Sequence, residues 1–438
     1  MRIFIRGVFA LFFLFSSFLI TAQSGTRLKM KIENLEEEYT ELWSYYGDDE
    51  LFVDSIRFGE NGLANYYSKE SLKRGLYKIV LPNTNSFELI ITEPKVVLQT
   101  DLVTPGKSMV IKKSQENKYY YELKKFVSSK RVAMNKLIRS HKDGSLNSML
   151  FNEQSTAITR EIKEYKLNVV TEAKGLLVSD LLLSGINPEI DTTLKEPYAD
   201  YLEQYLNHIN FGSSALLHSP VMDRRTVEYV DLLVAPYPYE KIEAINNVLN
   251  RCKGSPVVET YFVERFIERY ENLQIVGYDE IFSFLVTNYI DKTDYTESKK
   301  SLLRSKSDVV SQFLRGKEFA ITGIKEADLL DSLTAKYTLV VLWGETTSKK
   351  QLELIYDFSQ SYAKYDLKVF SISVGDDLVD LNIGQINKWV NVKGDSKVKL
   401  ELLMKANTML ILLDRDKKVI ARDIDLDFLI DTLDAWER

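Results

Sequence analysis

Three hydroxyl side chains and a lysine lie close together near position 350. They are Thr346, Thr347, Ser348 and Lys350. An amine that takes the proton of a neighbouring hydroxyl makes it a nucleophile, so this group could form a lysine-activated hydroxyl site. Serine and threonine directly before a helix also cap the first N–H groups of that helix with their side-chain oxygens. Because a helix is predicted to follow, we favour the cap.

The chain has one cysteine, Cys252, which stands between Arg251 and Lys253. Two neighbouring cations favour the thiolate, the reactive form of cysteine, so Cys252 could be a lone reactive thiol. The alternative is a cysteine without a chemical role near the end of a predicted helix, and we favour it. A single cysteine forms no internal disulfide, so packing must supply the stability of the fold.

No other group of residues has the pattern of a catalytic or metal site. The histidines His141, His208 and His218 lack the spacing of metal ligands, and His208 is interpreted as structural. Phosphate-binding glycine motifs and the nucleophile elbow of hydrolases are absent from the sequence. We therefore expect no metal and no cofactor.

The sequence between residues 27 and about 113 has the pattern of short β-strands. Apolar and polar residues alternate in short runs, and turn signals such as Asn61-Gly62 separate them. Short strands at this spacing are typical of a small sandwich or barrel. The predicted strands include Leu51–Val53, Leu76–Leu81, Phe87–Ile91 and Lys95–Leu98.

From about Asn117 to Lys317 the apolar residues recur with the period of a helix. The predicted helices include Thr156–Leu183, Tyr198–Ile209, Asp223–Val234, Tyr239–Arg251, Val257–Glu271 and Tyr278–Tyr289. The last part alternates strand and helix. Its predicted elements are the strand Tyr337–Trp343, the helix Lys350–Lys364, the strand Leu367–Val374, the helices Gln385–Val390 and Ser396–Lys405, the strands Met409–Leu413 and Lys418–Ala421, and the helix Asp427–Trp436.

Residues 1–23 have the pattern of a secretory signal peptide. Arg2 and Arg6 precede the apolar run Val8–Ile20, and small and polar residues follow up to Gln23, where we expect cleavage. The run is shorter than the ~20 residues that a membrane-spanning helix needs. With a net charge of −6, the chain lacks the basic balance of general nucleic-acid-binding proteins.

Three segments of the C-terminal region carry a family resemblance. They are Leu339–Trp343, the helix with Glu353 and Leu354, and Thr408–Asp414 followed by Lys417–Ile420. On these residues, the region 325–438 resembles the thioredoxin-like thiol-disulfide oxidoreductases of the bacterial cell envelope. The resemblance implies a thioredoxin fold, and it places the two active-site cysteines of the family at Thr347 and Lys350 and the facing cis-proline at Asn407.

Thiol–disulfide exchange needs one thiolate that attacks and a second thiol that resolves the mixed disulfide. Threonine and lysine supply neither, so the resemblance implies a site without redox activity. It also implies that the groove which holds an extended substrate in active relatives is retained. The residues expected along this groove are Trp343, Gly344, Thr346, Ser348, Ala406 and Thr408.

Two further parts of the chain resemble modules of Bacteroidetes-type envelope proteins. Residues 27–117 resemble a small β domain, and residues from about 200 to 290 resemble a helical module. The matching motifs are Tyr45–Asp48, Gly75–Tyr77, Phe87–Ile90, Asn207–Phe211 and Ser219–Val221. The predicted domains are a signal peptide (1–23), a small β domain (27–117), a helical module (118–320) and a thioredoxin-like domain without the cysteine pair (325–438).

These observations predict an α+β multidomain protein with an N-terminal β-sandwich-like domain, a helical middle module and a C-terminal thioredoxin-like α/β domain. The expected function is non-enzymatic: an exported protein that binds a client or serves as a scaffold subunit of an envelope complex. The expected location is the periplasm or the outer membrane, including peripheral association with a membrane complex. The alternative is an oxidoreductase that uses Cys252 or the thiols of a partner protein. A third interpretation, a sensor of a small ligand, has no direct support in the sequence.

Overall fold

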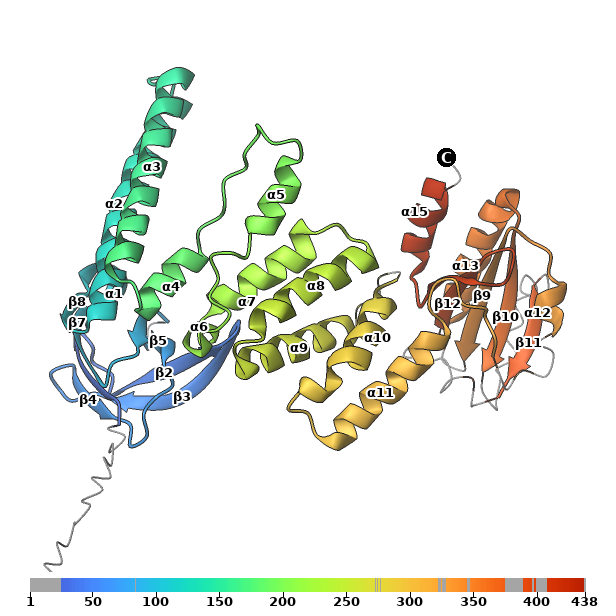
Figure 1. Cartoon of the computed structure of the whole chain (residues 1–438), viewed down its shortest axis with the longest axis horizontal. Helices are drawn as coiled ribbons and strands as arrows, with labels where there is room; N and C mark the ends of the chain where they lie inside the picture. The colour runs from blue at the N-terminus through green and yellow to red at the C-terminus, as the bar shows by residue number, and fades with distance from the viewer. Residues whose placement is uncertain are drawn as a thin grey trace, which may run out of the picture. The chain divides into compact units, whose positions relative to one another are not determined.

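The computed structural model describes residues 25–82, 84–271, 273, 275, 277–321, 324, 328–344, 347–374, 389–395, 398 and 408–436 (Figure 1). The chain divides into two compact units. Unit 1 contains residues 1–186 and 215–223, and unit 2 contains residues 187–214 and 224–438. The predicted helical module 118–320 therefore contributes helices to both units, and the domain boundaries stay a prediction.

Two four-stranded β-sheets form the N-terminal part of unit 1, with the strand orders β4-β1-β7-β8 and β3-β2-β5-β6. The strands of the first sheet are β1 (Arg27–Glu33), β4 (Leu63–Tyr67), β7 (Lys95–Asp101) and β8 (Val110–Lys113). Those of the second are β2 (Tyr39–Tyr46), β3 (Asp49–Arg57), β5 (Gly75–Val80) and β6 (Ser86–Ile91).

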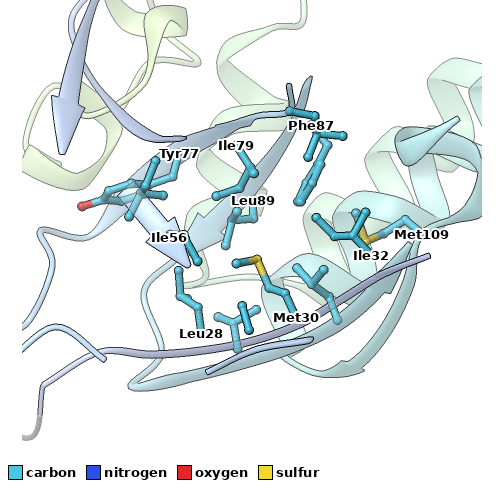
Figure 2. Close-up of a cluster of buried hydrophobic side chains, with 14 of the residues drawn as sticks. Leu28, Met30, Ile32, Ile56, Tyr77, Ile79, Phe87, Leu89 and Met109 are labelled. Atoms are coloured by element: carbon cyan, nitrogen blue, oxygen red, sulfur yellow. The ribbon is translucent and has the colours of Figure 1, made fainter. Parts of the chain in front are cut away.

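The two sheets pack face to face around one hydrophobic core. Leu28, Met30 and Ile32 are alternate residues of β1, so their side chains point to the same side of the sheet. They face Ile79 and Leu89 of the other sheet, as Figure 2 shows. The predicted β-rich N-terminal region is thereby confirmed.

Helices α1 (Pro105–Ser108), α2 (Gln115–Lys142), α3 (Ser148–Glu172) and α4 (Leu177–Ser184) complete this part of unit 1. The long helices α2 and α3 lie side by side, and the rings of Phe126 and Tyr165 stack with centroids 4.2 Å apart (Figure 1). The single helix predicted over Thr156–Leu183 is wrong, because the chain breaks between α3 and α4. Gly175 stands in this break with φ +87°, a left-handed conformation that ends a helix readily.

Two buried side chains at the start of α2 fix its position. The carboxylate of Glu116 accepts the N–H groups of Leu177 and Val178 at 2.9 and 2.7 Å, which caps the start of α4. The side chain of Asn117 bonds both the N–H and the C=O of Ile90 in β6. These bonds hold α2 and α4 against the sandwich.

Residues 215–223 belong to unit 1, although they are far from the sandwich in sequence. They include parts of α6 (Ser214–Leu217) and α7 (Pro220–Val227). The C=O of His218 accepts the N–H of Leu76 at 2.8 Å, and His218 Nδ1 lies 2.9 Å from the C=O of Tyr45. Gly75 is required here, since a Cβ atom on it would lie 2.4 Å from His218 Cβ.

Unit 2 begins with helices that mostly follow the predicted ranges. They are α5 (Pro197–Gln204), a π-helical turn (Glu228–Leu233), α8 (Pro238–Cys252), α9 (Pro256–Glu271), α10 (Tyr278–Tyr289) and α11 (Glu297–Gln312). The helix predicted over Tyr198–Ile209 is too long, because α5 ends at Gln204 and turns follow it. Helix α11 was not among the predicted helices.

A five-stranded sheet with the order β11-β10-β9-β12-β13 forms the C-terminal part of unit 2. Its elements are β9 (Tyr337–Gly344), α13 (Lys349–Tyr362), β10 (Leu367–Val374), β11 (Val390–Gly394), β12 (Thr408–Leu413), β13 (Val419–Arg422) and α15 (Leu426–Trp436). Strands β9, β10 and β11 are parallel, and β12 is antiparallel to both β9 and β13. The described elements follow the predicted order except between β10 and β12, where the structure has strand β11 at the edge of the sheet and does not describe most of the two predicted helices.

Strand β9 lies at the centre of this sheet, as its unbroken apolar run predicts. Leu339 and Val341 belong to a core cluster with residues of α13 and α15, and Val340 and Leu342 belong to a second cluster. The two sides of the strand are therefore both buried.

Two helices were predicted between strands β10 and β12, and the structure describes only parts of these segments. The one over Gln385–Val390 is wrong at its end, because Val390 begins strand β11, and residues 385–388 lie outside the described residues. The one over Ser396–Lys405 also lies outside them, except for Val398. Over the described parts of the chain, no helix combines the length and the apolar character needed to cross a bilayer.

Candidate functional site

The candidate site lies where β9 ends and α13 begins. Thr347 stands in this turn and is only 5% exposed. Its N–H donates to the C=O of Gly344 at 3.0 Å, and its Oγ1 accepts the N–H of Gly344 at 3.1 Å. The threonine side chain therefore closes the turn onto the end of the strand.

The hydroxyl of Thr347 also meets a residue from the neighbouring strand. Thr408 is the first residue of β12, and its Oγ1 lies 3.1 Å from Thr347 Oγ1. Strand β12 pairs with β9 so that Thr408 is opposite Trp343. Sequence reasoning named both threonines separately, and the sheet brings them together as a partly buried hydroxyl pair.

Ser348 and Lys350 have different surroundings from Thr347. Ser348 is the N-cap residue of α13, and its side chain accepts the N–H of Gln351 at 3.2 Å. Lys350 is exposed, and the described residues offer its side chain no hydrogen-bond or ion-pair partner. The structure thus favours the cap over the lysine-activated hydroxyl.

The remaining predicted positions are only partly described. Trp343 is half-buried, and its Nε1 donates to Ser371 Oγ at 2.8 Å. Thr346, Ala406 and Asn407 lie outside the described residues.

A cavity of about 260 Å³ opens beside Thr408. Its other walls come from α13, from β12 and from the segment between β13 and α15. The lining residues are Gln351, Leu354, Ile355, Thr408, Leu410, Asp423, Ile424, Asp425 and Leu426. Of these, sequence reasoning named only Thr408 as a groove residue. The spacing of Gln351, Leu354 and Ile355 along one helix face was the signal that could have found the rest of this wall.

The cavity combines an apolar floor with an acidic rim. Ile355, Leu410 and Ile424 are buried, whereas Leu354 is 52% exposed at the opening. Asp423 and Asp425 are the charged residues of the lining, which contains no lysine or arginine. Such a cavity can accept an apolar side chain and attracts a cation beside it.

Cys252 ends helix α8 and is fully buried. Burial, together with the carboxylate of Glu259, raises the pKa of its thiol to about 12. The flanking Arg251 is hydrogen-bonded to Asn247 and Asn207. The thiol therefore stays protonated at neutral pH, which disfavours the lone reactive cysteine.

Two of the histidines contact backbone carbonyl groups. His141 Nδ1 lies 3.0 Å from the C=O of Leu146, and His218 contacts Tyr45. Within the described ranges, no group of three or more histidine, cysteine or acidic side chains could hold a metal ion.

The structure of this chain resembles several solved structures of bacterial proteins. A thioredoxin-like protein from Bacteroides caccae is 19% identical, with 57% of this chain and 98% of that chain covered and a TM-score of 0.45. The solved structures that resemble this chain are thioredoxin-like proteins. They include a domain of a possible thiol-disulfide isomerase from Cytophaga hutchinsonii, which is 22% identical over 28% of this chain and 93% of that chain, with a TM-score of 0.25.

A third thioredoxin-like neighbour is the thioredoxin domain of a thiol-disulfide oxidoreductase from Bacteroides vulgatus. It is 18% identical over 28% of this chain and 96% of that chain, with a TM-score of 0.24. These neighbours are proteins of the kind that the sequence resemblance predicted. No family model matches the chain, and no curated protein matches it.

The hydroxyl pair gives a testable prediction. Thr347→Val leaves the N–H of Gly344 without its side-chain acceptor, so we expect the free energy of unfolding to fall by about 2 kcal/mol. Thr408→Val removes only the contact between the two hydroxyls and is expected to cost under about 1 kcal/mol. Urea unfolding followed by tryptophan fluorescence measures both changes. Equal stabilities of the two variants would show that Thr347 does not close the turn.

Proposed function

We propose that this chain is a redox-inactive protein of thioredoxin-like fold that binds an extended segment of a partner protein. The observation that carries the proposal is the partly buried contact between Thr347 and Thr408 next to a cavity that Thr408 also lines. Thr347, one member of this hydroxyl pair, is at a position that the resemblance assigns to a redox cysteine, and Thr408 is at a position that it assigns to the substrate groove. The neighbouring cavity supports a role in binding.

The chemistry of these groups supports binding rather than exchange. Thiol–disulfide exchange proceeds through sulfur–sulfur bonds, which a threonine hydroxyl cannot form. The sulfur of Cys252 is buried and stays protonated at neutral pH. An enzyme that used Cys252 would first have to open the end of helix α8.

The cavity suggests what the bound segment contains. An apolar side chain would fill the space beside Ile355 and Leu410. A lysine or arginine beside it would lie near Asp423 and Asp425, which favours cations. We therefore propose that the partner segment has an apolar residue next to a basic one.

We also propose that the protein works outside the cytoplasm, in the periplasm or at the outer membrane, as a client-binding or scaffold subunit. The support is the pattern of residues 1–23, with Arg2 and Arg6 before an apolar run. N-terminal sequencing of the protein from its native host is expected to begin near Ser24.

Peptide binding by matched leucine variants tests the cavity. Leu354 at its rim is 52% exposed, and Leu302 on α11, away from the cavity lining, is 56% exposed. On an array of immobilised peptides, the full chain is expected to bind sequences with adjacent apolar and basic residues. Leu354→Glu should weaken this binding about tenfold, because it buries a carboxylate against the ligand's apolar side chain.

Leu302→Glu is the control and should leave peptide binding unchanged. The double variant Asp423→Asn/Asp425→Asn should keep binding to apolar peptides and lose the preference for basic neighbours. If Leu354→Glu and Leu302→Glu bind the array equally well, the cavity is not the binding site.

A further inference from the structure

Unit 1 contains a larger cavity, of about 630 Å³, that the proposed function does not use. Its walls are residues 85–86 and 103–107 at the edge of the sandwich, the face of α2 from Tyr120 to Arg131, and Leu182 of α4. The buried bonds of Glu116 and Asn117 hold these helices in place. The cavity is therefore built from well-anchored elements.

The charge of this cavity is opposite to that of the chain. Aspartate and glutamate number 63 in the sequence, against 57 lysines and arginines. The cavity lining nevertheless contains three cations, Lys107, Lys124 and Arg131, and no carboxylate. A concave surface of one charge sign attracts ligands of the opposite sign.

One of the three cations already has a partner within unit 1. Glu88 Oε2 accepts the hydroxyl of Tyr120 at 2.5 Å and lies 3.0 Å from Lys124 Nζ. Burial alone would raise the pKa of Glu88, but Lys124 and Tyr120 outweigh it and hold the pKa below its usual value. Glu88 is therefore ionised, and its negative charge neutralises the positive charge of Lys124.

The other two cations of the lining, Lys107 and Arg131, have no acidic partner of this kind among the described residues. Among the residues that the structure describes, neither the side chain of Lys107 nor that of Arg131 has a hydrogen-bond or ion-pair partner. Both line the same cavity, so an anion placed there could contact both.

Apolar side chains make up much of the remaining lining. Leu123 and Val127 are one helical turn apart on α2, and Leu182 of α4 also lines the cavity. Val103 is 69% exposed at the sandwich edge. A ligand with an apolar body would cover these side chains.

We propose that this cavity binds an amphipathic organic anion, with a carboxylate near Lys107 and Arg131 and an apolar chain against Val103, Leu123 and Val127. The volume is within the range of small-molecule sites. The proposal is independent of peptide binding by unit 2.

Calorimetric titration of the full chain with decanoate, below its micelle concentration, tests the proposal. We expect saturable binding at one site per chain, and weaker binding as salt is added, because salt screens the two cations. Decylamine has the same chain length and the opposite charge, and it should not bind. Equal binding of decanoate and decylamine, or no saturable binding of decanoate, would overturn the proposal.

Three variants locate the site. Lys107→Glu/Arg131→Glu should weaken decanoate binding by about tenfold or more, since both cations become anions. Ser128→Trp should block binding by filling the cavity from an exposed position on α2. Lys118→Glu changes an exposed lysine of α2 outside the lining and should alter the affinity by less than about twofold. Melting temperatures confirm that each variant is folded, and unchanged affinity in the first two would refute the site.

Discussion

Replacing Lys241 by methionine is expected to lower the free energy of unfolding of unit 2 by about 3 kcal/mol. Lys241 on α8 is buried, and its ammonium group donates to the C=O groups of Val230, Asp231 and Val234 at 2.5, 3.0 and 3.0 Å. These carbonyls belong to the π-helical turn and the residue after it, where the regular helical bonds end. Methionine fills the space of lysine but leaves all three acceptors without this donor.

Lys253→Met is the matched control. Lys253 follows α8 directly and is exposed, so its replacement is expected to change the free energy of unfolding by less than about 0.5 kcal/mol. Thermal and urea unfolding of the two variants, compared with the unchanged chain, measure the difference. A Lys241→Met variant as stable as Lys253→Met would mean that water satisfies the carbonyls and that the buried lysine is not a structural cap.

Placing cysteines at positions 347 and 350 is expected to give a disulfide within the chain. Thr347 precedes helix α13 and Lys350 lies in its first turn. A thiol at a helix N-terminus has a lowered pKa, because the helix dipole stabilises the thiolate. We expect Thr347→Cys/Lys350→Cys to pair under mild oxidant and to open again with dithiothreitol.

Thiol labelling reads this outcome directly. The oxidised double variant should show no reactive thiol while folded, and only Cys252 should react after unfolding, since it is buried in the native chain. The pair Thr347→Cys/Lys349→Cys changes the spacing by one residue and is expected to pair poorly. If the thiols at 347 and 350 stay reduced in the folded protein, the correspondence with the cysteine pair of the thioredoxin-like proteins is wrong.

The elements around the candidate site could be predicted closely from local patterns. The strand Leu367–Val374 and the helix Tyr278–Tyr289 have the predicted bounds, because an unbroken apolar run and a helical period are signals that neighbouring residues carry. Ser348 was recognised as a cap for the same reason. Strand β11 was missed because Val390–Gly394 contains only two apolar residues and depends on pairing with β10.

The features that sequence reasoning missed depend on contacts between distant residues. Tyr45 and His218, which meet in unit 1, are 173 positions apart. The burial of Cys252 depends on the packing of α8, whereas its basic neighbours in sequence suggested a reactive thiolate. Asp423 and Asp425 become part of a cavity only because β13 leads into α15 beside α13.

Reduction of insulin disulfides with dithiothreitol as the electron source tests the central claim most directly. The full chain is expected to leave the rate at the background level, because the resemblance places Thr347 and Lys350, which carry no thiol, at the cysteine positions, and burial raises the pKa of the Cys252 thiol to about 12. An active thioredoxin measured in parallel shows that the assay responds. Catalysis above background by this chain, and its loss in Cys252→Ser, would contradict the account and establish a thiol-dependent enzyme.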